Sequence, residues 1–183
     1  MSYEIAINKA WDELLKSTAP REKSVKFLAD EFTLDYNQKK VLSLACNAPA
    51  KDFTVILILH YLAAAAKGLP ATTGKWLTFR ELSGIEGYYP AFRARSIEPV
   101  IRKHAHSPQG IFSVLERLPG KKAERGDASI VLFVLVGVPV LIALWGPDED
   151  FGPDANMFFD ESIKDIFCTE DIVVLAGIIA SQL

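Results

Sequence analysis

The chain has 183 residues, 50% of them apolar, and a formal net charge of −3. This size and composition are enough for one sizeable core, so we expect a single globular domain over residues 1–183. The acidic balance argues against nucleic acid as a partner, because phosphate binding needs a basic excess. The two cysteines, Cys46 and Cys168, lie far apart without metal-ligand spacing, which argues against a thiolate zinc or iron–sulfur site.

Charge is distributed unevenly along the chain. Residues 127–183 hold one basic and ten acidic residues, whereas residues 93–126 hold eight basic and three acidic ones. Such segments can pair across the fold or form an anion site, and a solvated basic face is the simpler interpretation. The first residues lack the basic region and apolar core of a signal peptide, so we expect a cytoplasmic protein.

Two helices and a hairpin are expected at the start of the chain. Apolar residues at helical spacing between Tyr3 and Leu14 predict an amphipathic helix that ends near residues 19–20. A second, short helix is expected over about 20–30. The segments TLDY and KKVLSLAC, on either side of residues 37–38, predict a β-hairpin.

The middle of the chain predicts a core helix and a strand. The helix runs from Phe53 to about Ala66, with Asp52 as its cap, and is apolar on all sides. His60 lies inside it, and we expect a neighbouring carbonyl to satisfy this side chain, in preference to a role as ligand or base. The segment GKWLTFREL at 74–82 alternates as a strand does.

Two more helices are expected around 88–104 and 107–118, followed by a basic surface loop over 120–126. The next 18 residues, 128–145, are uncharged, which raises the possibility of a transmembrane helix. Residues 137–139 (Gly-Val-Pro) interrupt the run and no basic anchor flanks it. We therefore expect two buried strands joined at this turn, and no membrane partner.

The last part of the chain completes an α+β fold. NMFFD and IKDIF predict one more strand or irregular edge, and a final helix begins at Thr169. The expected class is a single α+β domain with an antiparallel sheet, whose apolar central hairpin (about 128–145) is packed by several helices.

Residues 145–160 (WGPDEDFGPDANMFFD) are the segment richest in side chains that could form a site, with five carboxylates in sixteen positions. A calcium loop that begins at Asp148 fails, because Gly152 and Phe159 stand where that motif needs other residues. Clustered oxygens still make Asp148, Asp150 and Asp154 a candidate Ca²⁺ or Mg²⁺ site. The simpler interpretation is a solvated turn that keeps an apolar hairpin soluble.

Three other residues bear on a site. Asp127 and Asp160 border strand-like runs, where a carboxylate often accepts backbone N–H bonds and fixes a turn. Arg80 lies among aromatic residues and needs a carboxylate, a carbonyl or an anionic ligand, and the acidic segment is a candidate partner. Serine-hydrolase, phosphate-loop and dinucleotide motifs do not occur in the sequence, so a non-enzymatic role is favoured.

Five segments occur in an order that is similar to a known family. They are KWLTFREL (75–82), GD (126–127), VPVLIALWGPDEDF (138–151), MFFD (157–160) and TEDIVVL (169–175). With them the chain resembles, over nearly its whole length, the uncharacterised family catalogued as domain of unknown function 3786. Its members occur largely in anaerobic bacteria and archaea. The resemblance implies a cytoplasmic domain associated with metallocofactor or corrinoid-linked metabolism, without an assigned activity.

We therefore expect a non-catalytic binding or accessory domain whose partner is a small molecule or a cofactor-bearing protein. One alternative is a metal-dependent enzyme that uses the acidic 148–154 turn. Another is a homo-oligomeric interaction module, which depends on the exposure of the final apolar helix. No motif indicates which cofactor binds. The candidate ligand-binding residues are Trp76, Arg80, Trp145, Asp148, Glu149 and Asp150.

Overall fold

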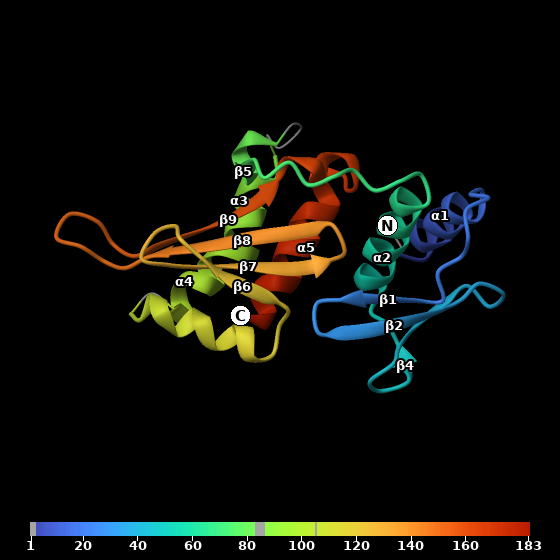
Figure 1. Ribbon diagram of the computed structural model, residues 1–183, viewed down its shortest axis with the longest axis horizontal. Coiled ribbons are helices and arrows are strands. Elements are labelled where there is room, and N and C mark those ends of the chain that lie inside the picture. The colour runs from blue at the N-terminus through green and yellow to red at the C-terminus, as the bar shows by residue number, and fades with distance from the viewer. Residues whose placement is uncertain (1–2, 83–86, 105) are drawn as a thin grey trace.

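Two antiparallel sheets, one from each half of the chain, organise the protein (Figure 1). The computed structural model describes residues 3–82, 87–104 and 106–183. The predicted α+β class is confirmed, although the expected single sheet is replaced by a four-stranded and a five-stranded one. The buried apolar residues of both halves form one connected cluster.

The N-terminal half is a four-stranded meander with two helices packed against each other. Its strands follow one another in the order β1-β2-β3-β4, and the predicted hairpin around 37–38 is confirmed as β2 and β3. The elements are α1 (Tyr3–Leu15), β1 (Ser24–Phe27), β2 (Asp30–Asp35), β3 (Lys40–Ser43), β4 (Ala48–Pro49) and α2 (Asp52–Ala65).

The short helix predicted over 20–30 is wrong, because these residues form β1 and the turn into β2. Val25 and Phe32 are paired across the two strands. Val25 and Phe32 are spaced in sequence as residues on one face of a helix are. In the structure the chain reverses direction after β1, and the two residues lie on one face of a hairpin. The cap predicted for α2 is also wrong: Lys51 is the N-cap residue and Asp52 lies in the first turn, where its charge suits the helix dipole.

The C-terminal half is a five-stranded sheet in the order β5-β9-β8-β7-β6. The predicted hairpin at 128–145 is confirmed as β7 and β8, and β8 lies at its centre because β9 and β7 flank it. The basic segment at 120–126 begins with an edge strand, where the structure differs from the predicted loop, and lysines are common on such edges. The strands are β5 (Trp76–Thr78), β6 (Gly120–Ala123), β7 (Ala128–Leu135), β8 (Val138–Trp145) and β9 (Asp154–Asp160).

Helices α3, α4 and α5 lie behind this sheet in Figure 1, on its inner face. A π-helical turn, residues 93–97, connects α3 and α4, and the helix predicted over 107–118 is a 3-10 helix over 108–116. The final helix begins at Thr169, as predicted. Among the described residues, no helix is both long and apolar enough to cross a bilayer. The helices are α3 (Tyr89–Phe92), α4 (Glu98–His104) and α5 (Thr169–Gln182).

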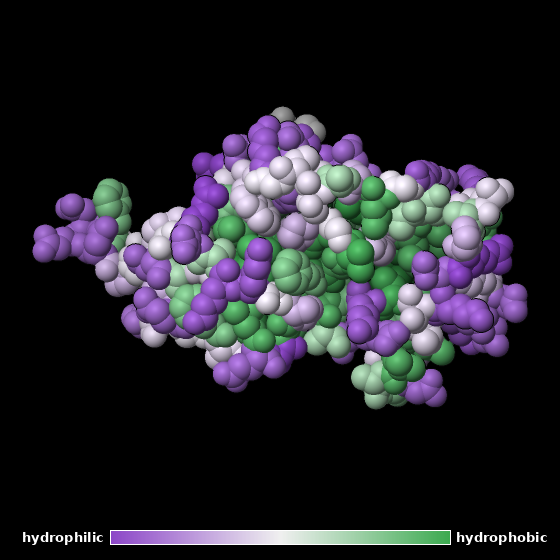
Figure 2. All heavy atoms as spheres, viewed as in Figure 1, coloured by the Kyte–Doolittle hydropathy of each residue, from purple (hydrophilic) through white to green (hydrophobic). Residues whose placement is uncertain are grey.

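Two hydrogen bonds join the halves at the end of the β7–β8 hairpin. The backbone N–H of Leu28, in the β1–β2 turn, donates to the Val134 carbonyl at 2.8 Å. The Tyr61 hydroxyl of α2 donates to the Val136 carbonyl at 3.0 Å. Figure 2 shows apolar side chains gathered where the halves meet. Contact between the halves is therefore both apolar and polar.

Asp160 ties the segment that precedes β5 to the end of β9. It is 2% exposed, and its carboxylate accepts the backbone N–H groups of Thr73 at 3.0 Å, Gly74 at 2.7 Å and Ser162 at 3.0 Å. Burial by itself would raise the pKa of Asp160, but the hydrogen bonds from Thr73, Ser162 and Gly74 outweigh it and lower the pKa below 3.8. The prediction that Asp160 fixes a turn through backbone N–H groups is confirmed.

Replacement of Asp160 tests this role. Asp160→Ala leaves the N–H donors without their acceptor and is expected to lower the free energy of unfolding by about 3 kcal/mol, and Asp160→Asn, which keeps one acceptor oxygen, by about 1.5 kcal/mol. Because the native pKa is lowered, the stabilisation is complete above the unfolded pKa of about 4 and is lost as pH falls through the native pKa. Urea unfolding at pH 7 and at pH 3 measures both effects. The exposed Asp165→Asn variant is the control, and a loss for Asp160→Asn that is as large at pH 3 as at pH 7 would contradict the explanation.

Candidate functional site

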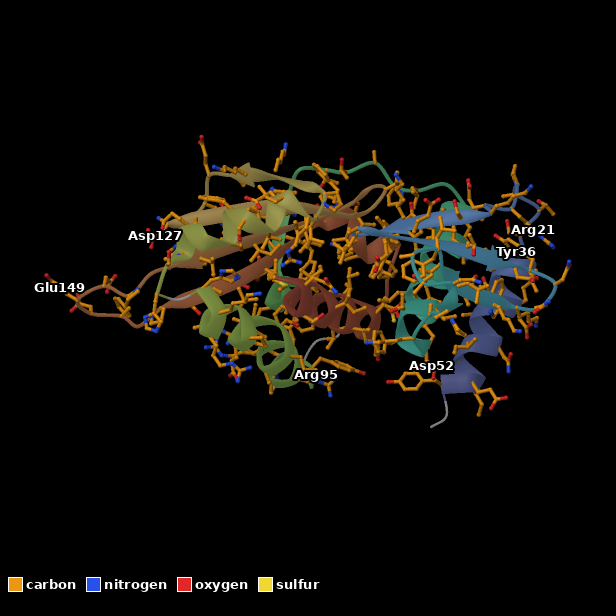
Figure 3. The ribbon with its side chains drawn as sticks, turned by 90° about the horizontal axis from the view of Figure 1, so that it is seen from below. Arg21, Tyr36, Asp52, Arg95, Asp127 and Glu149 are labelled. Carbon is orange, nitrogen blue, oxygen red and sulfur yellow. The ribbon has the colours of Figure 1, made fainter. Side chains whose placement is uncertain are left out.

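The acidic turn is an exposed loop that projects from one end of the five-stranded sheet, with Glu149 near its tip (Figure 3). The Asp148 carboxylate accepts the backbone N–H groups of Asp150 at 2.9 Å and of Phe151 at 2.7 Å, so it stabilises its own turn. Within the described parts of the chain, no three His, Cys, Asp or Glu side chains are grouped closely enough to hold a metal ion. The metal site at Asp148, Asp150 and Asp154 therefore stays a prediction that the geometry does not favour.

Arg80 does not meet the acidic turn. It is an exposed residue of the 3-10 turn that follows β5, and its guanidinium carbon lies 4.0 Å from the centre of the Tyr89 ring. The strand predicted over 74–82 is thus shorter than expected, because Thr78 and Glu81 form a capping box that turns the chain after Thr78. In the described structure the partner of the Arg80 guanidinium is therefore the Tyr89 ring, and not a carboxylate, a carbonyl or an anionic ligand as the sequence suggested.

The two candidate tryptophans, Trp76 and Trp145, do share a surface. Both pack on the outer face of the sheet, against a small apolar cluster that contains Phe158. The guanidinium carbon of Arg125 lies 3.8 Å from the centre of the Phe158 ring and covers part of this face. Asp127, at the same end, accepts the Gly146 N–H at 2.7 Å, as predicted for a backbone acceptor, but this bond joins the ends of β7 and β8 and does not fix a turn. The outer face of the five-stranded sheet is therefore covered by these aromatic rings and the Arg125 side chain, where other sheets have a second layer of helices.

His60 is paired with a carboxylate. Its Nδ1 atom lies 2.7 Å from Oδ2 of Asp171, which is 7% exposed at the start of α5. The sequence correctly predicted a satisfied histidine, but the partner is not the expected carbonyl. Cys168 precedes α5 and is exposed, yet desolvation, followed by the nearby Asp171 charge, raises the pKa of its thiol to about 11. A thiol of this pKa is a poor nucleophile at neutral pH. The side chains of His60, Asp171 and Cys168 are therefore better described as a structural link between α2 and α5 than as a catalytic triad.

A groove of about 660 Å³ lies between the first sheet and α5. It separates the β1–β2 turn and the start of α2 from α5, whose apolar residues otherwise face the core. Phe27 and Phe32 line one wall, and Val174 and Ile178 of α5 line the other. The sequence did not indicate this site, because its walls come from segments more than a hundred residues apart and carry no shared motif.

The polar residues of the groove come from several elements, including the first sheet, the start of α2, the π-helical turn and the end of α5. Lys51, Thr54 and Arg95 line it, together with the exposed Cys46. A hydrogen bond with the Ser43 side chain lowers the pKa of the Cys46 thiol, which makes this thiol the more reactive of the two described cysteines.

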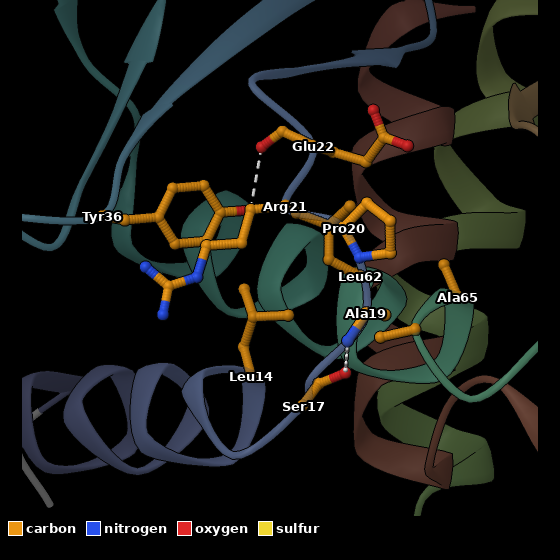
Figure 4. A pocket seen from close by; sticks show the side chains of 10 residues that line it. Leu14, Ser17, Ala19, Pro20, Arg21, Glu22, Tyr36, Leu62 and Ala65 are labelled. Atoms are coloured by element: carbon orange, nitrogen blue, oxygen red, sulfur yellow. Dashed lines mark hydrogen bonds between the residues drawn. The ribbon is translucent and has the colours of Figure 1, made fainter.

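A smaller hollow of about 200 Å³ lies between α1, α2 and residues 17–22 (Figure 4). The guanidinium carbon of Arg21 lies 5.2 Å from the centre of the Tyr36 ring, and the Tyr36 hydroxyl donates to the Glu22 carbonyl at 2.8 Å. Burial raises the pKa of Tyr36. The polar groups of this hollow are already paired with each other, so the larger groove is the better candidate site.

The link between α2 and α5 can be tested by a double-mutant cycle. His60→Gln and Asp171→Asn are each expected to lower the free energy of unfolding, and the coupling between them is expected to be about 1 kcal/mol, because the imidazole is partly exposed. Chemical unfolding of both single variants and the double variant at pH 7 measures the coupling. The exposed pair Lys16 and Glu13 provides a control cycle with weaker coupling. Strictly additive effects of His60→Gln and Asp171→Asn would show that the contact does not join the helices.

Comparison with known proteins gives a family without an assigned activity. A family model described as a domain of unknown function (DUF3786) matches residues 11–182. No curated protein and no solved structure matches the chain. The matched range covers nearly the whole chain and includes both sheets and every residue named above as lining the groove. The chain therefore belongs to the DUF3786 family, as its sequence motifs indicated.

Proposed function

We propose that this protein is a non-catalytic binding domain and that its ligand occupies the groove between the first sheet and α5. The observation that carries the proposal is the groove itself. Its volume of about 660 Å³ is within the range of about 300–1,000 Å³ that is typical of small-molecule sites. Apolar walls with a few polar residues are also typical, since apolar contacts supply affinity and polar groups fix orientation.

The lining favours binding over catalysis. Among the described residues that line the groove there is no histidine, and Asp30 is the one carboxylate. Asp30 is thus the one carboxylate near Cys46, and no histidine of the described lining stands beside this thiol as a general base, although hydrogen bonding lowers its pKa. The His60 and Asp171 pair lies outside the lining. A binding role needs none of these groups to react.

We further propose that the ligand is a metallocofactor or corrinoid compound, or a protein that carries one, in the cytoplasm. The family to which the chain belongs supports this part of the proposal through its metabolic setting. The oligomeric alternative has less support, because most apolar residues of α5 are buried or line the groove.

Ligand binding in the groove can be tested with N-phenyl-1-naphthylamine, an uncharged fluorescent probe. The wild-type protein is expected to bind it at one site. Gly177 lines the groove, and a Cβ atom added there would have only the Cβ atom of Arg95 within 4 Å, so Gly177→Leu places a larger side chain in the groove without a backbone clash. This variant is expected to weaken binding about tenfold or more. Gly152→Leu, in open space on the acidic turn, is the matched control.

Two further measurements connect the probe with the groove and with a natural ligand. In a Cys168→Ser background, bound probe is expected to slow alkylation of Cys46 by N-ethylmaleimide, because Cys46 lines the groove. Hydroxocobalamin or haem at a hundredfold excess over its Kd would stabilise the protein by about 2.7 kcal/mol in thermal unfolding. If Gly177→Leu binds the probe as tightly as Gly152→Leu does, the groove is not the site and the proposal fails.

A further inference from the structure

We propose that the ligand of the groove is an amphipathic anion, whose carboxylate or phosphate group lies at the N-terminus of α2. The inference rests on the proposed function, because it names the class of ligand for the same groove. It combines three features of the groove lining: an uncapped helix N-terminus, a hydroxyl without a partner on a residue that is only 8% exposed, and two basic side chains.

The start of α2 presents unpaired donors. The helix has 14 residues, and its N-cap residue Lys51 is extended and provides no side-chain cap. Within the described chain, no group accepts a hydrogen bond from the backbone N–H of Asp52, Phe53 or Thr54. Such N–H groups, aligned with the positive end of the helix dipole, are favourable partners for an anion. The Asp52 carboxylate adds a negative charge to this first turn, but it accepts no hydrogen bond from these N–H groups in the described structure.

Thr54 points independently to a polar ligand. Its side chain lines the groove although the residue is only 8% exposed. In the described structure the Thr54 hydroxyl has no hydrogen-bond partner. The residue is mostly buried but its hydroxyl is not fully enclosed, so it is free to donate to a ligand oxygen in the groove.

Two basic residues flank this position. Lys51 precedes α2, and Arg95 belongs to the π-helical turn; both line the groove. Figure 3 shows Arg95 on a separate element from Asp52, which is at the start of α2. Arg95 has no ion pair within the described residues. Its stem passes over Gly177 of α5, where a side chain would be 4.0 Å away. The guanidinium is therefore free to attract an anion in the groove.

The rest of the groove is suited to an apolar body. Phe27 and Phe32 on one wall face Val174 and Ile178 on the other. The single carboxylate of the described lining, Asp30, lies close to Cys46 and would repel an anion placed at that end. Charge and apolar surface together favour a ligand with its anionic group at the start of α2 and its apolar part between the sheet and α5.

The test compares two probes that differ by one anionic group. The charged probe is 8-anilinonaphthalene-1-sulfonate, and the uncharged one is N-phenyl-1-naphthylamine. The Lys51→Gln/Arg95→Gln double variant is expected to weaken sulfonate binding about tenfold, and Thr54→Val about threefold. Binding of the uncharged probe is expected to change less than about twofold, because neither variant alters the apolar walls. The Lys40→Gln/Arg102→Gln variant removes the same charges outside the groove and is the matched control.

Competition identifies the head group. Octanoate and octyl phosphate are expected to displace the sulfonate probe at concentrations about tenfold lower than 1-octanol, which has the same chain without the charge. The better of the two anions distinguishes a carboxylate ligand from a phosphate ligand.

The outcomes separate this inference from the proposed function. If the double variant and Thr54→Val bind the sulfonate as the wild type does, and 1-octanol competes as well as the anions, the anion inference is overturned. The groove proposal still stands in that case, provided that Gly177→Leu abolishes binding of the uncharged probe. If Gly177→Leu leaves both probes bound, both proposals fail together.

Discussion

The strands β7 and β8 are apolar on both faces, and the rest of the structure is arranged to cover them. On the inner face, residues such as Ile130 and Ile142 enter the main core, beneath the helices. On the outer face, Val131 and Leu141 are covered by tryptophans and by the Phe158 ring with its arginine. A strand pair in this position excludes water from both sides, which explains why its sequence is a continuous apolar run without polar alternation.

The same hairpin also organises the contact between the two halves. Its far end accepts hydrogen bonds from Leu28 of the first sheet and Tyr61 of α2, and the His60 and Asp171 pair adds a third link. Leu28 has a φ of +55°, an uncommon conformation for a side chain of this kind, and the bond to Val134 helps to compensate for it. These links hold the halves together at a few points. The space between them, at the start of α2, remains open as the groove.

The functional interpretation shifts from the acidic turn to this groove. Five carboxylates in a short segment attract attention in the sequence, yet Asp148 stabilises its own turn and Arg80 stacks on Tyr89. By contrast, Lys51, Thr54 and Arg95 have no special pattern in sequence. The tertiary structure brings them together along one hollow that also has apolar walls, which is the usual composition of a ligand-binding site.

The sequence by itself determined the elements whose pattern is local: the α1 and α2 helices, the β2–β3 and β7–β8 hairpins, and the helix from Thr169. It also determined that Asp127 and Asp160 accept backbone N–H bonds, because a carboxylate beside a strand end meets backbone donors a few residues away or on a neighbouring strand. Only the tertiary structure decided that residues 24–27 pair as a strand, that α5 and the first sheet form the groove, and that His60 meets Asp171. These features depend on contacts between segments distant in the chain, and local propensity and periodicity contain no information about which distant surfaces will meet.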